Sequence, residues 1–148
     1  MAIYALAELH LSLSVADKTM EVFGSSWDGY ITKIKESWES MVTDKDTVLI
    51  PGDISWATYV EKGEDDFRFI SELPGRKIMC RGNHDYWWTT IKKMEDFFAE
   101  KGFRNLELVR TNVIEADDCL ISGTRGWMIE SKECVEGTEN KKIYEREK

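Results

Sequence analysis

Both histidines of this 148-residue chain stand beside acidic or amide residues, in short segments whose side chains are suited to binding a metal ion. These segments are Glu8-Leu9-His10, Gly52-Asp53 and Gly82-Asn83-His84-Asp85. Carboxylate oxygens, an amide oxygen and imidazole nitrogens together suit Mn, Fe or Zn better than calcium. Each segment also has an ordinary explanation. In that explanation, Glu8 and His10 are simply an exposed pair at a strand end, and Asp53 belongs to a turn. Asn83 or Asp85 would then cap a helix.

Each of the three segments ends or follows a short apolar run that is typical of a buried strand. We predict these strands at residues 2–9, 47–50 and 77–80. Helical spacing of apolar residues predicts helices over 28–42, with Asp28 as N-cap, and over 59–73 and 86–101. Because open α/β sheets bind ligands beyond the carboxyl ends of their strands, the three segments are expected to meet there. Alternation along the first strand predicts that Glu8 and His10 point to one face.

After residue 105 the pattern changes to short strand-like runs with tight connections, at 106–110, 113–116 and 119–122. These runs predict hairpins in place of helical crossovers. The chain contains no internal repeat and no Pro/Gly/Ser-rich linker. The pattern therefore predicts one α/β domain over residues 1–148.

The charge and composition narrow the classes of partner. The net charge is −8, and residues 1–74 carry 14 acidic against 6 basic side chains. A Lys/Arg-rich surface for nucleic acid is not evident, and the acidic balance suits either a bound cation or simple solubility. Three cysteines without a CxxC pair are expected to be reduced. The absence of a long apolar stretch or a basic leader argues against membrane insertion and favours the cytoplasm.

In order and spacing, the three segments resemble the calcineurin-like metallophosphoesterases, whose pattern runs Asp-x-His, Gly-Asp, then Gly-Asn-His-Asp/Glu. The strings PGDISW, RGNHDYWW and GTRGW are similar to a bacterial branch of that family, and the resemblance covers residues 2–127. It implies a mixed sheet sandwich flanked by helices and a centre of two divalent metal ions. By the same resemblance Glu8 and His10 hold one ion, Asp53 bridges both, and Asn83 binds the second. His84 is then an acid oriented by Asp85, and a metal-activated hydroxide hydrolyses phosphomonoesters or phosphodiesters.

Two departures from the family pattern shape the remaining expectations. Glu8 stands where the family has Asp, and no histidine follows His84, although the family pattern continues with a lone His and Gly-His-x-His. We therefore interpret the chain as truncated at its C-terminus, with an incomplete second sheet and an exposed sheet edge that a homodimer covers. The activity is then impaired, and the alternative function is a catalytically inactive binding or structural module.

Overall fold

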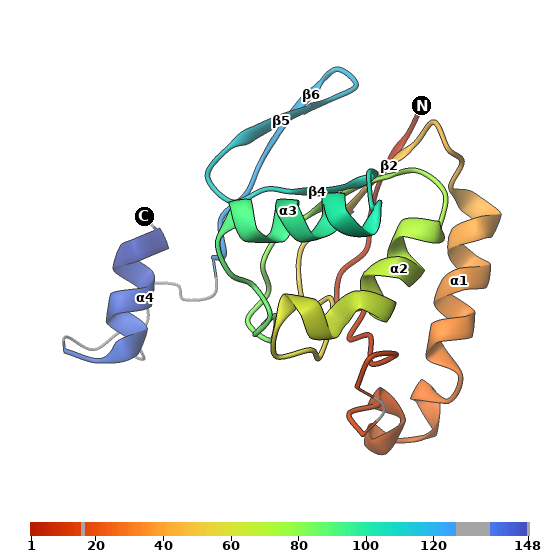
Figure 1. Ribbon diagram of the computed structural model, residues 1–148, viewed down its shortest axis with the longest axis horizontal. Coiled ribbons are helices and arrows are strands. Elements are labelled where there is room, and N and C mark those ends of the chain that lie inside the picture. The colour runs from red at the N-terminus through yellow and green to blue at the C-terminus, as the bar shows by residue number, and fades with distance from the viewer. Residues whose placement is uncertain (16, 127–136, 148) are drawn as a thin grey trace.

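A four-stranded parallel sheet forms the centre of the molecule in the computed structural model, which describes residues 1–15, 17–126 and 137–147 (Figure 1). Its strands, in spatial order, are β1 (Ile3–Ala5), β2 (Thr47–Ile50), β3 (Arg76–Met79) and β4 (Leu106–Leu108). Registers such as Ala5↔Leu49 and Ile50↔Met79 align the carboxyl ends of the first three strands. The predicted α/β class is confirmed, and the predicted meeting of the motif segments has a structural basis.

Helical crossovers connect the parallel strands. They are α1 (Tyr30–Met41), preceded by the short turns η1 (Met20–Phe23) and η2 (Ser25–Trp27), then α2 (Glu64–Glu72), preceded by η3 (Val60–Gly63), and α3 (Ile91–Lys101). All three α-helices begin later than predicted, at residues 30, 64 and 91. The N-cap of α1 is Gly29 rather than Asp28. The third helix begins at residue 91 because Thr90 accepts a hydrogen bond from the Lys93 N–H.

The helices pack against one face of the sheet. Alternate strand residues Val48, Ile50 and Met79 face Trp38 of α1, Phe67 of α2 and Phe98 of α3 in one apolar cluster. This packing fixes the ends of the strands, and therefore the starting points of the loops that follow them.

The opposite face carries a hairpin of β5 (Val113–Ala116) and β6 (Cys119–Ser122), which form a second, antiparallel sheet. Ile114 and Ala116 pack there against Ile78 and Val109. The second sheet that the family resemblance implies is therefore confirmed, and it is small, with two strands among the described residues. The run at 106–110, however, is not part of a hairpin: β4 joins the parallel sheet because α3 makes a full crossover before it.

The remaining described elements lie outside this core. Helix α4 spans Glu139–Glu147. Cys119 is exposed, and the Cys80 thiol donates to the Thr124 carbonyl at 3.7 Å. Cys134 and Trp127, the last residue of the GTRGW string, lie outside the described residues. Among the described helices, none combines the length and the apolar character that crossing a bilayer requires.

Candidate metal centre

Beyond the ends of β1 and β2, the two loops continue side by side and bring the first two motif segments together. The backbone N–H of Glu8 donates to the Gly52 carbonyl at 3.2 Å, and that of His10 donates to the Asp53 carbonyl at 2.9 Å. The next bond, from Leu11 N–H to the Ile54 carbonyl, is also 2.9 Å long. These bonds fix Glu8, His10 and Asp53 relative to one another before any side chain interacts.

Glu8, His10 and Asp53 all have left-handed backbone conformations, with φ of +61°, +44° and +53°. Non-glycine residues rarely adopt this region, and such strain costs on the order of 1–3 kcal/mol per residue. Among the described residues the only other non-glycine case is Asp117, in the turn between β5 and β6. Regular strand alternation therefore does not explain how Glu8 and His10 converge, because β1 ends at Ala5 and both residues lie in a strained loop.

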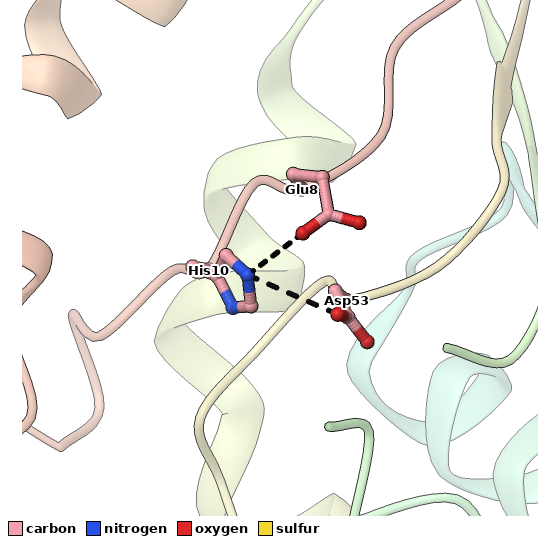
Figure 2. Close-up of side chains that lie close together, drawn as sticks. All are labelled: Glu8, His10 and Asp53. Carbon is pink, nitrogen blue, oxygen red and sulfur yellow. Dashed lines mark hydrogen bonds and ion pairs between the residues drawn. The ribbon is translucent and has the colours of Figure 1, made fainter. Parts of the chain in front are cut away.

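The three side chains turn toward one point, as Figure 2 shows. His10 Nε2 lies 3.0 Å from Glu8 Oε2 and 3.9 Å from Asp53 Oδ2. One ligand atom from each residue lies within 4.8 Å of the other two. The side chains of His10 and Asp53 are 9% and 5% exposed, whereas that of Glu8 is 66% exposed, so the group opens to solvent on the Glu8 side. Two carboxylates and one imidazole fit a divalent cation of the Mn, Fe or Zn type.

The loop after β3 closes on this group through an unusually tight contact between two glycines. A Cβ on Gly52 would lie 2.4 Å from the Gly82 nitrogen, and a Cβ on Gly82 would lie 2.1 Å from Asp53 Oδ1. Real Cβ atoms do not approach so closely, so both positions require glycine. The approach lets the His84 N–H donate to Asp53 Oδ1 at 2.9 Å, which orients the Asp53 carboxylate.

The carboxylate of Asp85 connects the loop after β2 to the loop after β3. Its oxygens accept hydrogen bonds from the backbone N–H groups of Asp53, Ile54 and Gly82, each at 2.8 Å, from Ser55 N–H at 3.3 Å and from Trp87 Nε1 at 2.9 Å. Burial raises the pKa of the Asp85 carboxyl, while the N–H donors act in the opposite direction. The carboxylate is engaged by backbone and indole donors, so it holds these loops in place. Its predicted role in orienting His84 stays a prediction.

The imidazole of His84 lies beside the metal group, with its ring centroid 5.8 Å from that of His10. It is half-buried, and its Nδ1 atom has no hydrogen-bond partner among the described residues. Asn83 is exposed on the same loop. Neither Asn83 nor Asp85 caps α3, since Thr90 does so, and the ordinary explanation for this segment is therefore excluded. The assigned roles of Asn83 and His84 stay predictions.

Two residues that support the centre were not singled out from the sequence. The Tyr30 hydroxyl donates to the His10 carbonyl at 2.7 Å. Asp66, buried on α2, accepts from Leu13 N–H at 2.7 Å and from the Ser55 hydroxyl at 2.5 Å, and its burial raises the pKa of its carboxyl. A signal for Asp66 exists in the sequence, because it shares one helical face with the apolar Ile70 and Leu73, at i+4 and i+7.

Two comparisons with known proteins found a similarity to this chain. A sequence model of the family described as calcineurin-like phosphoesterase matches residues 1–142. Among solved structures, the chain is similar to a protein of unknown function from Aquifex aeolicus. The TM-score is 0.52 and the sequence identity 20%, over 98% of this chain and 72% of that chain. At this identity the likeness shows the fold alone. No curated protein matches the chain.

Proposed function

The chain belongs to the calcineurin-like phosphoesterase family, and from this premise we propose that it hydrolyses phosphate esters at a centre of two divalent metal ions. At the level of the family, the protein is a metal-dependent phosphoesterase with phosphate-ester substrates. The proposal adds the number of ions and the residues that act. The observation that supports it most directly is the convergence of Glu8, His10 and Asp53, whose ligand atoms lie within 4.8 Å of one another.

In the proposed site, Glu8 and His10 would hold one ion, Asp53 would be a ligand of both, and Asn83 would contribute its amide oxygen to the second. The bound ions would be Mn, Fe or Zn, and they would supply positive charge that clamps the phosphate and favours ionisation of the attacking water. The tight contact between Gly52 and Gly82 supports the bridging role of Asp53, since it fixes this carboxylate between the two loops.

His84 is proposed to act as the general acid. As water attacks phosphorus, the bond to the alcohol oxygen breaks, and that oxygen takes a proton from the His84 imidazole. An imidazole suits this step because it can carry and release a proton near neutral pH. Its position, 5.8 Å in ring separation from His10, places it next to the ligand group without making it part of that group.

The test is metal stoichiometry combined with turnover. Protein loaded with Mn and desalted is analysed for bound metal, and cleavage of p-nitrophenyl phosphate and bis(p-nitrophenyl) phosphate is measured with Mn present. We expect about two ions per chain and activity above a metal-free blank. Asp53→Asn should lose both, because it keeps the shape of the side chain and removes its charge.

The matched control is Asp117→Asn, since Asp117 has a similar left-handed φ of +55° but lies in the β5–β6 turn. Metal content and turnover should be unchanged in this variant. Bound metal without turnover would instead favour the catalytically inactive module. Metal that Asp53→Asn does not remove would contradict the proposed site.

We also propose a domain organisation, an oligomeric state and a cellular location. Residues 1–148 are proposed to unfold as one domain, in a single transition by both fluorescence and circular dichroism. Two copies are proposed to pair through the edge strand β1, which has a neighbour in its sheet on one side. Light scattering at tens of micromolar would show a dimer or overturn this pairing. Cell fractionation tests the proposed cytoplasmic location.

A further inference from the structure

Three aromatic rings meet at the edge of the proposed centre. The Trp56 indole stacks on the His10 imidazole with a centroid distance of 4.9 Å and an interplanar angle of 20°. The same indole lies 5.2 Å from the His84 ring, tilted by 53°. Since the two imidazoles are 5.8 Å apart, the three rings form a nearly equilateral triangle. Trp56 therefore contacts both the proposed metal ligand and the proposed acid.

The backbone fixes Trp56 in this position. Its N–H donates to the Leu11 carbonyl at 2.9 Å, which continues the pairing of the two loops beyond His10 and Asp53. The neighbouring residues are also held, because the Ser55 hydroxyl donates to Asp66 at 2.5 Å and accepts from the Ala57 N–H at 3.0 Å. The indole is thus attached to a loop segment that is anchored on both sides.

The indole N–H of Trp56 does not hold the ring in place through a hydrogen bond to the described residues. Trp56 Nε1 is buried and has no partner among the described residues. A buried donor without an acceptor is destabilising, and Phe or Leu at this position would avoid that cost. The contact of the flat indole with the two imidazoles must therefore offset this cost.

Other residues near the two imidazole rings have different contacts. The Asp85 carboxylate is engaged by backbone N–H groups and Trp87. Tyr86 also contacts His84, at a centroid distance of 6.2 Å, but its side chain is largely exposed. Of the ring contacts described here, those of Trp56 alone reach both imidazoles.

We propose that Trp56 is a positioning residue whose indole sets the ring planes of His10 and His84 relative to each other. This inference rests on the proposed function, since it assigns Trp56 the task of aligning a metal ligand with the acid. It concerns the orientation of the rings and is independent of which metal binds.

The first test uses metal-free protein and needs no activity. The chain has two histidines, so their ring protons give a simple NMR spectrum that can be assigned with single His variants. An indole stacked at 4.9 Å shifts nearby protons through its ring current. Trp56→Leu should move the ring resonances of both histidines, and Trp56→Phe should move them less. If either histidine keeps its wild-type resonances in Trp56→Leu, the inference is wrong.

The second test measures Mn affinity by calorimetry, and kcat and KM for the aryl phosphate. Changing a residue that orients a metal ligand typically weakens binding about 10–100-fold. We expect a loss in this range and a lower kcat for Trp56→Leu, with partial recovery in Trp56→Phe. The control is Trp38→Phe, which loses a buried indole bonded to the Pro74 carbonyl, far along α1 from the loops. Equal effects in Trp38→Phe and Trp56→Leu would reduce Trp56 to a packing role and overturn the inference.

These tests separate the inference from the proposed function. If wild-type protein binds no metal and has no turnover, the proposed function fails. The NMR comparison of Trp56→Leu with wild type would still confirm or refute the positioning of the two rings.

Discussion

The backbone N–H of Asp53 donates to Asp85 Oδ2 at 2.8 Å, so the proposed bridging ligand is held in its strained conformation by a buried carboxylate 32 residues further along the chain. The same carboxylate accepts from Gly82 at 2.8 Å, which ties the loop after β2 to the loop after β3. A second buried carboxylate, Asp66, accepts hydrogen bonds from Leu13 N–H and from the Ser55 hydroxyl. Two acids outside the group of converging ligands therefore stabilise the loops that carry it.

Asp85→Asn is expected to destabilise the fold as well as the centre. The change places an amide NH₂ among groups that are all donors, and hydrogen bonds to a charged acceptor contribute about 1.5–3 kcal/mol each. We expect the free energy of unfolding in urea to fall by about 2 kcal/mol or more, with weaker Mn binding in calorimetry.

The control for this variant is Asp96→Asn, which removes an exposed ion pair with Lys92 on α3. Such surface pairs contribute at most about 1 kcal/mol, so this variant should resemble wild type. Wild-type stability of Asp85→Asn together with a reduced kcat would contradict the structural role. That result would instead support the predicted role of Asp85 in orienting the His84 imidazole.

Gly82→Ala is expected to abolish metal binding. The added Cβ would lie 2.1 Å from Asp53 Oδ1 and 2.2 Å from the Asp53 nitrogen, so the Asp53 loop must move away. Gly102→Ala is a useful comparison, since a Cβ there meets no atom within 4 Å and the change adds only strain at a φ of +77°. We expect Mn binding by calorimetry to be lost in the first variant and kept in the second. Retained Mn binding in Gly82→Ala would show that the contact between the loops is not required.

Much of the site was predictable because parallel strands bring their carboxyl ends to one edge. The residue types of the three segments and their places after apolar runs were enough to bring Glu8, His10 and Asp53 together. The left-handed backbone at these residues was not predictable, since it depends on hydrogen bonds between loops that are distant in the sequence. For the same reason the end of β1 at Ala5 was missed.

The function of a buried acid was harder to predict than its presence. A carboxylate next to a histidine in sequence can orient the imidazole or accept backbone N–H groups, and the letters Asn-His-Asp do not distinguish these cases. The structure favours the second for Asp85. Helix patterns were more reliable, because α1, α2 and α3 all lie within the predicted ranges, although the N-caps of α1 and α3 differ.

Glu8→Asp tests the departure of this chain from its family. Glu8 reaches His10 Nε2 at 3.0 Å with its longer side chain, and its exposure leaves room for an aspartate to adjust. We expect Mn affinity of Glu8→Asp to stay within about tenfold of wild type, whereas Glu8→Gln should bind more weakly because it lacks the charge. Both are measured by calorimetry. Equal affinity of wild type and Glu8→Gln would remove Glu8 from the ligand set.

Lys77 predicts a dependence of stability on pH that is separate from the metal centre. Its side chain is fully buried in β3 and its ammonium donates to the Leu73 carbonyl. Burial lowers the pKa of Lys77 from its ordinary 10.5 to about 8. Between these two values the unfolded chain binds more protons than the folded one, so stability rises with pH across this window. Below about pH 8 the cost of charging the buried amine is fully present.

Lys77→Met removes this titration and keeps a side chain of similar length. We expect the rise in the free energy of unfolding between pH 7.5 and 10.5 to be smaller in the variant, by at most about 3 kcal/mol. Urea unfolding at several pH values measures it, and the difference between the two proteins cancels the other groups that titrate there. Parallel curves for the two proteins would mean that the pKa of Lys77 is not lowered in the folded state, and that its ammonium is satisfied by the Leu73 carbonyl despite its burial.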